Sequence, residues 1–361
     1  MSKFKIVGIN FDHMHMGDLL RLAKNHAGVE IVGVSDYVDG RAQGVLKQLD
    51  LHESLFHADY RKLIESTKPD LIVLCPATAQ HADWTEIVAP FGTHVLVEKP
   101  FAASLAEADR MIAALKKTGK ELIINWPLRW YPPHITAKRL CDEGAIGEVI
   151  QVHYYDGNRG PMRHVADKIE ISAERAAELK SESWFYKKET GGGSMLDYLG
   201  YGTTLGTWYM NGRAPIEITA MTDTPTGLEV DEHSITIARY DIANSGLSKF
   251  ETRWGTFSDP WANQPQPKCG FAIVGRLGTI TSYDYESTIR LQTSPQSSGE
   301  LIPVDQIEAP FDNAINYVVH CLQTGQPIDG PLGAACARVG QQIVDTAYQS
   351  SQQKRTLPLV K

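Results

Sequence analysis

A lysine at the end of an apolar run has the clearest chemical use in this sequence. Residues 94–97 lead directly into Glu98-Lys99-Pro100, so Lys99 is expected at the carboxyl end of a buried parallel strand. That edge of a doubly wound sheet is where ligands bind, and the following proline favours an extended backbone at Lys99. An ammonium group held stiffly there could polarise a bound oxygen. The alternative is an ordinary surface lysine beside a loop proline.

A carboxylate and a phenol lie four residues apart after a run of three glycines. Gly191-Gly192-Gly193 precede Ser194 and an apolar-spaced segment, which predicts a tight turn that opens a helix with Ser194 as its N-cap. Asp197 and Tyr201 would then share one helix face, where they could bind or deprotonate a hydroxyl group. Alternatively, Asp197 completes a cap with Ser194 and Tyr201 is a core residue.

The first βα turn carries an incomplete dinucleotide-binding fingerprint. In the complete motif, three glycines let the backbone approach a pyrophosphate that is seated on a helix N-terminus. Only Gly8 is present here, and Asn10 and His13 occupy the second and third glycine positions. Asparagine can adopt unusual backbone angles but histidine leaves less room, so this motif alone indicates a dinucleotide only weakly.

An acid after the second predicted strand gives firmer support for a dinucleotide. Asp36 stands within reach of the offset, about 20 residues, at which a carboxylate accepts a hydrogen bond from the adenosine ribose. A carboxylate there also repels a 2′-phosphate, which favours NAD, although Arg41 nearby leaves NADP open. In the alternative interpretation Asp36 is a plain turn acid, because Asp39-Gly40 follows it.

Strand and helix patterns alternate through the first third of the chain. Strands are predicted at residues 4–9, 29–35, 70–75, 94–97 and 122–124, and helices at residues 16–26, 40–49, 83–89 and 104–117. The last helix starts at Ser104 with Glu107 three residues on, which is a capping-box pattern. This alternation predicts a right-handed, doubly wound parallel sheet in a domain of residues 1–124.

The pattern changes after Asn125-Trp126-Pro127 to short strands rich in Val, Ile, Thr and Tyr. These strands are predicted at residues 148–156, 216–222, 234–240, 249–254, 272–276 and 279–285, largely without helical spacers. A second domain with an antiparallel or mixed sheet is therefore expected over residues 125–332. Helices are predicted at residues 311–323 and 334–351, and the segment 333–361 is expected to pack back on the first domain.

Composition argues against several classes of protein. The 361 residues are 42% hydrophobic and 22% charged, with a formal net charge of −8, so a nucleic-acid partner is not expected. No apolar stretch has the length of a signal segment or a membrane span, which predicts a cytoplasmic protein. The five scattered cysteines indicate neither a disulfide framework nor a zinc site. His13 and His15 lack an acid or histidine partner of recognisable pattern, so no metal is predicted.

Taken together, these segments resemble the Gfo/Idh/MocA oxidoreductases, a family that includes glucose-fructose oxidoreductase and inositol dehydrogenase. The resemblance covers essentially the whole chain and is carried, in order, by residues 76–81, Glu98-Lys99-Pro100, residues 129–132, residues 144–149 and the triple-glycine helix. It implies an N-terminal Rossmann domain and a C-terminal α/β domain, whose large, open, mainly antiparallel sheet mediates homodimer or homotetramer contacts. It also implies a carbohydrate or polyol substrate and a tightly held NAD or NADP.

Carried over by position, the resemblance places Lys99 between nicotinamide and substrate and makes Asp197 the substrate-binding aspartate. Tyr201 stands where histidine is common, as in the glucose-fructose oxidoreductase branch, where the phenol is assigned acid–base duty. A nearby ammonium group such as that of Lys99 would favour the phenolate. The expected catalytic residues are therefore Lys99, Tyr201 and Asp197.

Two further sets of residues are expected to line the site. The cofactor set is Gly8, Asn10, Phe11, Asp12, His13, Asp36, Arg41, Pro76, Ala77, His81, Glu98, Lys99, Pro100, Asn125 and Arg129. The substrate set is Lys99, Trp126, Tyr154, Trp184, Asp197 and Tyr201, with ordinary packing as the alternative for the aromatic members.

The functional expectation is hydride transfer between NAD(P) and a hydroxyl carbon of a sugar, sugar derivative or polyol. Some relatives instead use NAD transiently to cleave glycosidic bonds by oxidation, elimination and re-reduction, and others are non-catalytic sensors that bind a dinucleotide. Retention of Lys99, Asp197 and Tyr201 argues against a sensor but does little against the glycosidase.

Overall fold

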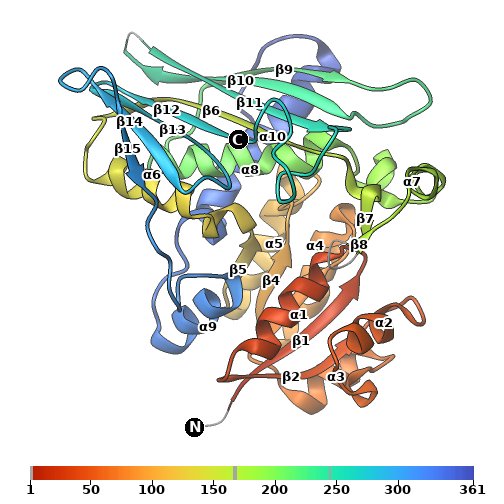
Figure 1. Cartoon of the computed structure of the whole chain (residues 1–361). Coiled ribbons are helices and arrows are strands. Elements are labelled where there is room, and N and C mark those ends of the chain that lie inside the picture. The colour runs from red at the N-terminus through yellow and green to blue at the C-terminus, as the bar shows by residue number, and fades with distance from the viewer. Residues whose placement is uncertain (1–2, 166–168, 244) are drawn as a thin grey trace. The chain divides into compact units, whose positions relative to one another are not determined.

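The computed structural model describes residues 3–165, 169–243 and 245–361, and its chain divides into two units (Figure 1). The first unit contains Met1–Asn125, Met162–Leu179 and Ala309–Ala334, and the second contains Trp126–Pro161, Lys180–Glu308 and Ala335–Lys361. The first change of unit falls beside the division expected at residue 124, but two later segments return to the first unit. Within the described part of the chain, no helix is long and apolar enough to cross a membrane.

The first unit is built on a parallel five-stranded sheet of order β2-β1-β3-β4-β5, as the strand and helix alternation predicts. Its strands are β1 (Phe4–Phe11), β2 (Val29–Ser35), β3 (Leu71–Cys75), β4 (His94–Glu98) and β5 (Leu122–Asn125). The helices between them are α1 (His15–Asn25), α2 (Arg41–Gln48), α3 (Tyr60–Thr67), α4 (His81–Val88) and α5 (Leu105–Thr118). Every residue of β3 is buried, as in a strand that is covered on both faces.

Side-chain caps explain where two of these helices begin. The Ser104 hydroxyl accepts a hydrogen bond from the Glu107 N–H at 3.3 Å, and Glu107 Oε2 accepts one from the Ala103 N–H at 3.1 Å, so the expected cap of α5 is formed. Helix α3 was not expected from the sequence. It begins after Asp59, whose carboxylate accepts from the N–H groups of Arg61 and Lys62. The later segments add β7 (His164–Val165), β8 (Ile169–Glu170), α7 (Ala173–Lys180) and α9 (Ala314–Thr324).

The second unit contains a nine-stranded sheet of order β15-β14-β13-β12-β6-β11-β10-β9-β16. Its strands are β6 (Val149–Asn158), β9 (Glu217–Asp223), β10 (His233–Ile242), β11 (Ser245–Trp254), β12 (Gly270–Gly275), β13 (Gly278–Tyr283), β14 (Thr288–Thr293), β15 (Glu300–Pro303) and β16 (Leu357–Pro358). All neighbouring strands are antiparallel except β6 and β11. The mainly antiparallel sheet implied by the family resemblance is therefore present.

One face of this sheet is covered by helices α6 (Pro132–Asp142), α8 (Ser194–Tyr209) and α10 (Ala334–Gln353). Helix α8 lies close to the sheet, and glycine at residue 202 permits this approach. A Cβ added there would come within 2.8 Å of the Tyr154 ring, so a larger residue would not fit. Helix α10 from Ala335 onward and the strand after it belong to the second unit. The packing of residues 333–361 on the first domain stays a prediction. Thr203 Oγ1 donates to the Gly340 carbonyl at 3.2 Å, and β16 pairs with β9.

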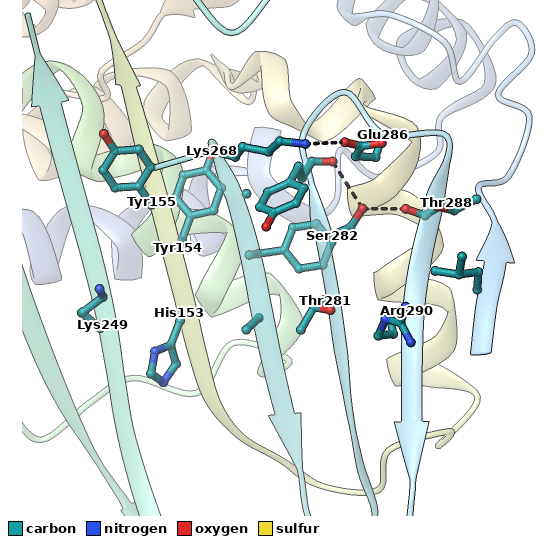
Figure 2. A pocket seen from close by; sticks show the side chains of 15 residues that line it. His153, Tyr154, Tyr155, Lys249, Lys268, Thr281, Ser282, Glu286, Thr288 and Arg290 are labelled. Atoms are coloured by element: carbon teal, nitrogen blue, oxygen red, sulfur yellow. Dashed lines mark hydrogen bonds and ion pairs between the residues drawn. The ribbon is translucent and has the colours of Figure 1, made fainter. Parts of the chain in front are cut away.

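The opposite face of the sheet is open and carries a hollow of about 560 Å³ (Figure 2). Side chains alternate between the two faces of a strand, so His153 and Tyr155 face outward where Tyr154 faces α8. Lys249, Lys268 and Arg290 give the hollow a basic lining. Among its lining residues only Tyr154 belongs to the predicted site, so this hollow is distinct from the predicted site.

Candidate active site

The turn between β1 and α1 carries two of the predicted cofactor residues, Gly8 and Asn10. Gly8 lies close to α1, because an added Cβ would lie 3.0 Å from Met16 Sδ and a larger residue would need Met16 to shift. Asn10 takes the left-handed backbone conformation at φ 65°, as its place in the fingerprint anticipates. Its side chain is buried, and its Nδ2 has no hydrogen-bond partner among the described residues. An unpaired buried donor is costly, so this amide suits an anionic ligand at the turn.

The end of β2 holds a compact group of charges. Arg41 binds Asp36 through two hydrogen bonds, Nε to Oδ2 at 2.5 Å and Nη2 to Oδ1 at 2.6 Å, and its Nη1 donates to Asp12 at 2.7 Å. Tyr37 donates its hydroxyl to the same Asp12 oxygen at 2.6 Å. Burial, together with Asp12, raises the pKa of Tyr37 to about 12, so this hydroxyl remains a donor. Thus Asp12, Asp36 and Arg41 come together, and Arg41 neutralises the acid expected to select NAD.

The end of β4 presents Glu98 and Lys99, both of them buried. Glu98 Oε1 lies 2.7 Å from His15 Nδ1, and Glu98 Oε2 accepts from Asn125 Nδ2 at 2.8 Å. Burial alone would raise the pKa of Glu98, but His15, Lys99 and Asn125 outweigh it and hold the pKa below its ordinary value. The carboxylate therefore stays ionised at neutral pH. The sequence did not reveal the contact with His15, because 83 residues separate the two.

His81 fixes two strand-end loops to one another. Its Nδ1 lies 3.1 Å from the Phe101 carbonyl and its Nε2 lies 3.2 Å from the Pro76 carbonyl. Burial lowers the pKa of His81, which favours the neutral ring. A neutral ring carries one N–H, so it donates to one of these two carbonyls and only packs against the other. His81 thereby lies beside the segment that contains the cis Lys99-Pro100 bond. Pro76, Ala77 and Pro100 are buried in these same loops, and Phe11 ends β1 with its backbone paired to Cys75.

Helix α8 begins differently from the expectation. Its N-cap is Gly193, at φ 106°, and Ser194 is already its first residue. Ser194 Oγ donates to Asp231 Oδ2 at 2.7 Å, and the Met195 N–H donates to the same oxygen at 2.9 Å. Asp231, from the segment before β10, therefore caps α8, whereas the alternative interpretation of the sequence gave this role to Asp197. Burial raises the pKa of Asp231 to about 6 despite these hydrogen bonds.

Asp197 and Tyr201 are both buried residues of α8, one helical turn apart. Tyr201 contacts Trp126 edge to face, with ring centroids 5.2 Å apart. Trp126 Nε1 is a buried donor with no partner among the described residues, and the Trp126 ring fits only because residue 200 is glycine. The structure thus brings Trp126 and Tyr201 together in the second unit.

Tyr198 lies between Asp197 and Tyr201 in the sequence and was not predicted to be a site residue. Its hydroxyl bonds Asn158 Nδ2, and burial, followed by Asp156 and Asp197, raises its pKa well above the ordinary value. It lies 5.5 Å from Tyr201, centroid to centroid. The sequence signal that could have found it is its place on the same glycine-led helix.

Three of the expected site residues make contacts that packing within the second unit explains. The Tyr154 hydroxyl donates to Asp284 at 3.0 Å, in a buried network that His134 completes at 2.9 Å from the same carboxylate. This bonding places Tyr154 in the core of the second unit. Trp184 stacks on Phe185 at a centroid distance of 3.8 Å. Arg129 lies over the ring of Trp208, with Cζ 4.8 Å from the ring centroid.

Comparison with known proteins supplies the family. A model described as "Oxidoreductase family, NAD-binding Rossmann fold" matches residues 2–126, and one described as "GFO/IDH/MocA C-terminal domain" matches residues 134–281. The inositol 2-dehydrogenase of Salmonella typhimurium is 32% identical over 165 residues, which are 44% of this chain and 47% of that enzyme. The matching region thus spans about half the length of that relative.

Two solved structures share the fold along the whole chain. The aldose-aldose oxidoreductase from Caulobacter crescentus, complexed with glycerol, has a TM-score of 0.77 at 18% identity and covers 99% of this chain and 100% of its own. An oxidoreductase domain protein from Kribbella flavida has a TM-score of 0.79 at 18% identity and covers 100% of both chains. With both family models matched in order on this two-unit fold, the chain belongs to the Gfo/Idh/MocA oxidoreductase family.

Proposed function

We propose that this protein is an NAD(P)-dependent oxidoreductase that transfers a hydride between nicotinamide and a hydroxyl carbon of a sugar, sugar derivative or polyol. The observation that carries the proposal is the buried Glu98-Lys99 pair at the carboxyl end of β4, within a unit matched by the NAD-binding family model. The inositol 2-dehydrogenase match supports a polyol or sugar as the substrate class.

Groups of the first unit would hold the dinucleotide. The unpartnered Asn10 amide at the β1 turn suits the pyrophosphate. Asp36 already accepts from Arg41 and from the Tyr37 N–H. A carboxylate has about four lone-pair sites, so acceptor capacity remains for ribose hydroxyls. When bound, the nicotinamide ring accepts or donates the hydride.

Three residues would handle the substrate. Lys99 would polarise the substrate oxygen, Tyr201 would take or return its proton, and Asp197 would hold a neighbouring hydroxyl. Lys99 belongs to the first unit whereas Asp197 and Tyr201 belong to the second, so their meeting in one site is part of this proposal. Their burial supports it, because a charge or phenol kept from water interacts more strongly with a reacting group.

We further propose that the protein forms a homo-oligomer through the open face of the nine-stranded sheet. Met221, Ile235, Ile237 and Leu247 are exposed on β9, β10 and β11. The strand register puts all four on the same face, outside the cover of α8. Such an exposed apolar strip is typical of a surface that a partner covers.

The proposed function is tested by titrating the purified protein with NADH and NADPH, followed by a screen of sugars and polyols, myo-inositol among them, at the reduced-nicotinamide absorbance. Saturable NADH binding with turnover of any such substrate is the expected result. Release of sugar from an aryl glycoside without net NADH formation would mean that the protein is a glycosidase. Binding without any turnover would mean a sensor, and no binding would overturn the cofactor assignment.

A further inference from the structure

One cluster of metal-ligating side chains stands out among the described residues. His13, His15 and Glu98 each offer one ligand atom, and these atoms lie within 4.8 Å of one another. The two histidines alone gave no reason to expect a metal, because no acid or histidine partner of recognisable pattern accompanies them in the sequence. The fold supplies that acid.

The topology explains how Glu98 reaches the histidines. Strands β1 and β4 are separated in the sheet by β3. After β1 the chain crosses the end of β3, where the His13 N–H donates to the Cys75 carbonyl at 3.0 Å. This crossing brings the start of α1 to the carboxyl end of β4, and His15 Nδ1 comes within 2.7 Å of Glu98 Oε1. The cluster therefore depends on the fold rather than on local spacing.

The donors and their geometry suit a transition metal. Two imidazoles and one carboxylate are a ligand set of Zn²⁺ sites that keep a fourth position for water. Metal–ligand bonds of about 2.0–2.2 Å in a tetrahedral site put ligand atoms about 3.3 Å apart, so the cluster needs only small side-chain adjustments. The His13 and His15 rings already lie with centroids 4.4 Å apart and 63° between their planes.

Two features of the surroundings favour a bound cation, and one nearby charge opposes it. Asn125 donates to Glu98 Oε2 at 2.8 Å, which turns Oε1 toward His15, as partners of metal ligands commonly do. Glu98 is fully buried, whereas the His15 side chain is 22% exposed and gives access from solvent. The Lys99 ammonium, close enough to act on Glu98, opposes a cation, so we expect moderate affinity.

We propose that His13, His15 and Glu98 bind one divalent transition-metal ion of the Zn²⁺ class, with water completing the coordination. The ion would replace the proton between His15 Nδ1 and Glu98 Oε1, which leaves to solvent, and one ring nitrogen of His13 would be its third protein ligand. The rival account is a purely hydrogen-bonded cluster that orients Glu98.

The experiment titrates Zn²⁺ into the full chain, freed of metals and dinucleotide, by calorimetry, with Co²⁺ absorbance as a second readout. One Zn²⁺ per chain with a Kd on the order of 1 μM is expected. His15→Ala and Glu98→Gln should each weaken binding about 100-fold, and Asn125→Ala about 10-fold, since partners of metal ligands contribute 10–100-fold.

His26→Ala is the matched control. His26 caps the other end of α1 and also accepts a backbone N–H, that of Gly28 at 3.0 Å, but it is not part of the cluster. Its variant should bind Zn²⁺ like the unaltered protein. Absence of stoichiometric binding, or equal binding by Glu98→Gln, would overturn the proposal. Glu98→Gln keeps the side-chain shape, so circular dichroism should report a native fold. No dinucleotide or sugar is present, so failure of the proposed oxidoreductase function would leave the result intact.

Discussion

Lys99 is the residue whose removal tests the proposed chemistry most directly. Lys99→Ala should lower turnover by about 100-fold or more, because the substrate oxygen loses its cationic partner, while NADH affinity stays nearly unchanged. Steady-state kinetics and an NADH titration on the same preparation separate the two effects. Lys117→Ala, at an exposed position of α5, is the control. Near-normal turnover in Lys99→Ala would remove Lys99 from the chemistry.

We expect Asp36 to influence the choice of coenzyme through its bond with Arg41. In Asp36→Ser the carboxylate that repels a 2′-phosphate is gone, and Arg41 Nε and Nη2 are released while Nη1 keeps its bond to Asp12. The ratio of NADPH to NADH affinity should therefore rise by roughly 10-fold or more, as expected for a gained charge-assisted contact. Fluorescence titrations with both coenzymes measure it. The exposed neighbour Asp39, changed to Ser, should leave the ratio alone, and an equal ratio in both variants would contradict the assignment.

At this scale the sequence predicted best where function depends on local chain order. The position of Lys99 at the end of a buried strand was predicted because an apolar run and a proline flank it, and both act within a few residues. The cap of α8 and the acid beside His15 were missed for the opposite reason. Asp231 lies 37 residues from Ser194, and Glu98 lies 83 residues from His15, so only the fold brings them together.

The start of α8 should show a measurable pH dependence through Asp231. Its pKa rises from 3.8 to about 6 in the folded protein, so the folded state favours the protonated acid. The ionised Asp231 carboxylate destabilises the folded state, and this cost is absent below the pKa of the unfolded chain and complete above the pKa of the folded protein. Asp231→Asn keeps an oxygen acceptor without the charge. Its unfolding free energy relative to the unaltered protein should therefore rise by about 2–3 kcal/mol between pH 4 and pH 7.

Urea unfolding of both proteins at several pH values measures this difference. Asp241→Asn, at an exposed position on β10, is the control and should give a flat difference across the same range. A flat difference for Asp231→Asn as well would mean that this carboxyl titrates normally in the folded protein.

The packing of α8 against Trp126 should tolerate no side chain at residue 200. A Cβ added at Gly200 would lie 2.2 Å from Trp126 Cη2, and Trp126 is buried. Gly200→Ala should therefore lower the free energy of unfolding by about 1–3 kcal/mol, as overpacking does. Gly44→Ala in α2 has no described heavy atom within 4 Å of the new Cβ and should be stabilising by up to about 1 kcal/mol. Opposite shifts of the thermal midpoint are expected, and stabilisation of both variants would refute the close packing.

Helices and strands were predicted well where a single sequence pattern, such as a long apolar run, was strong. The five parallel strands were found because their apolar runs are covered on both faces, as the burial of β3 shows. Helix α3 was missed because it has only 8 residues, two of them buried, which gives little periodicity. The element that α10 packs on could not be derived, because an amphipathic pattern shows that a helix has a buried face but not which element covers it.

On the scale of the whole molecule, the order of the nine-stranded sheet could not be derived from strand patterns. Strand β6 pairs in parallel with β11 and antiparallel with β12, although both partners lie about a hundred residues or more along the chain. The outward face was also unpredictable without the register. Once the register is known, the apolar strip on β9, β10 and β11 becomes visible, and it makes the oligomer testable.

Ile237→Glu should separate the subunits without harming the fold. On β10 this residue is directly opposite Lys249 of β11, so a glutamate would gain a cross-strand ion pair within one chain. In an oligomer this ion pair would be removed from water against the apolar strip of a second copy, and that desolvation costs several kcal/mol, or more than 100-fold in the dissociation constant. Sedimentation velocity at micromolar concentration should show the unaltered protein as an oligomer and this variant as a monomer, with the same circular dichroism spectrum. Phe257→Glu alters a fully exposed aromatic residue outside the sheet and should remain oligomeric. An oligomer that persists in Ile237→Glu would place the contact elsewhere, and a monomeric unaltered protein would mean that the strip serves another partner.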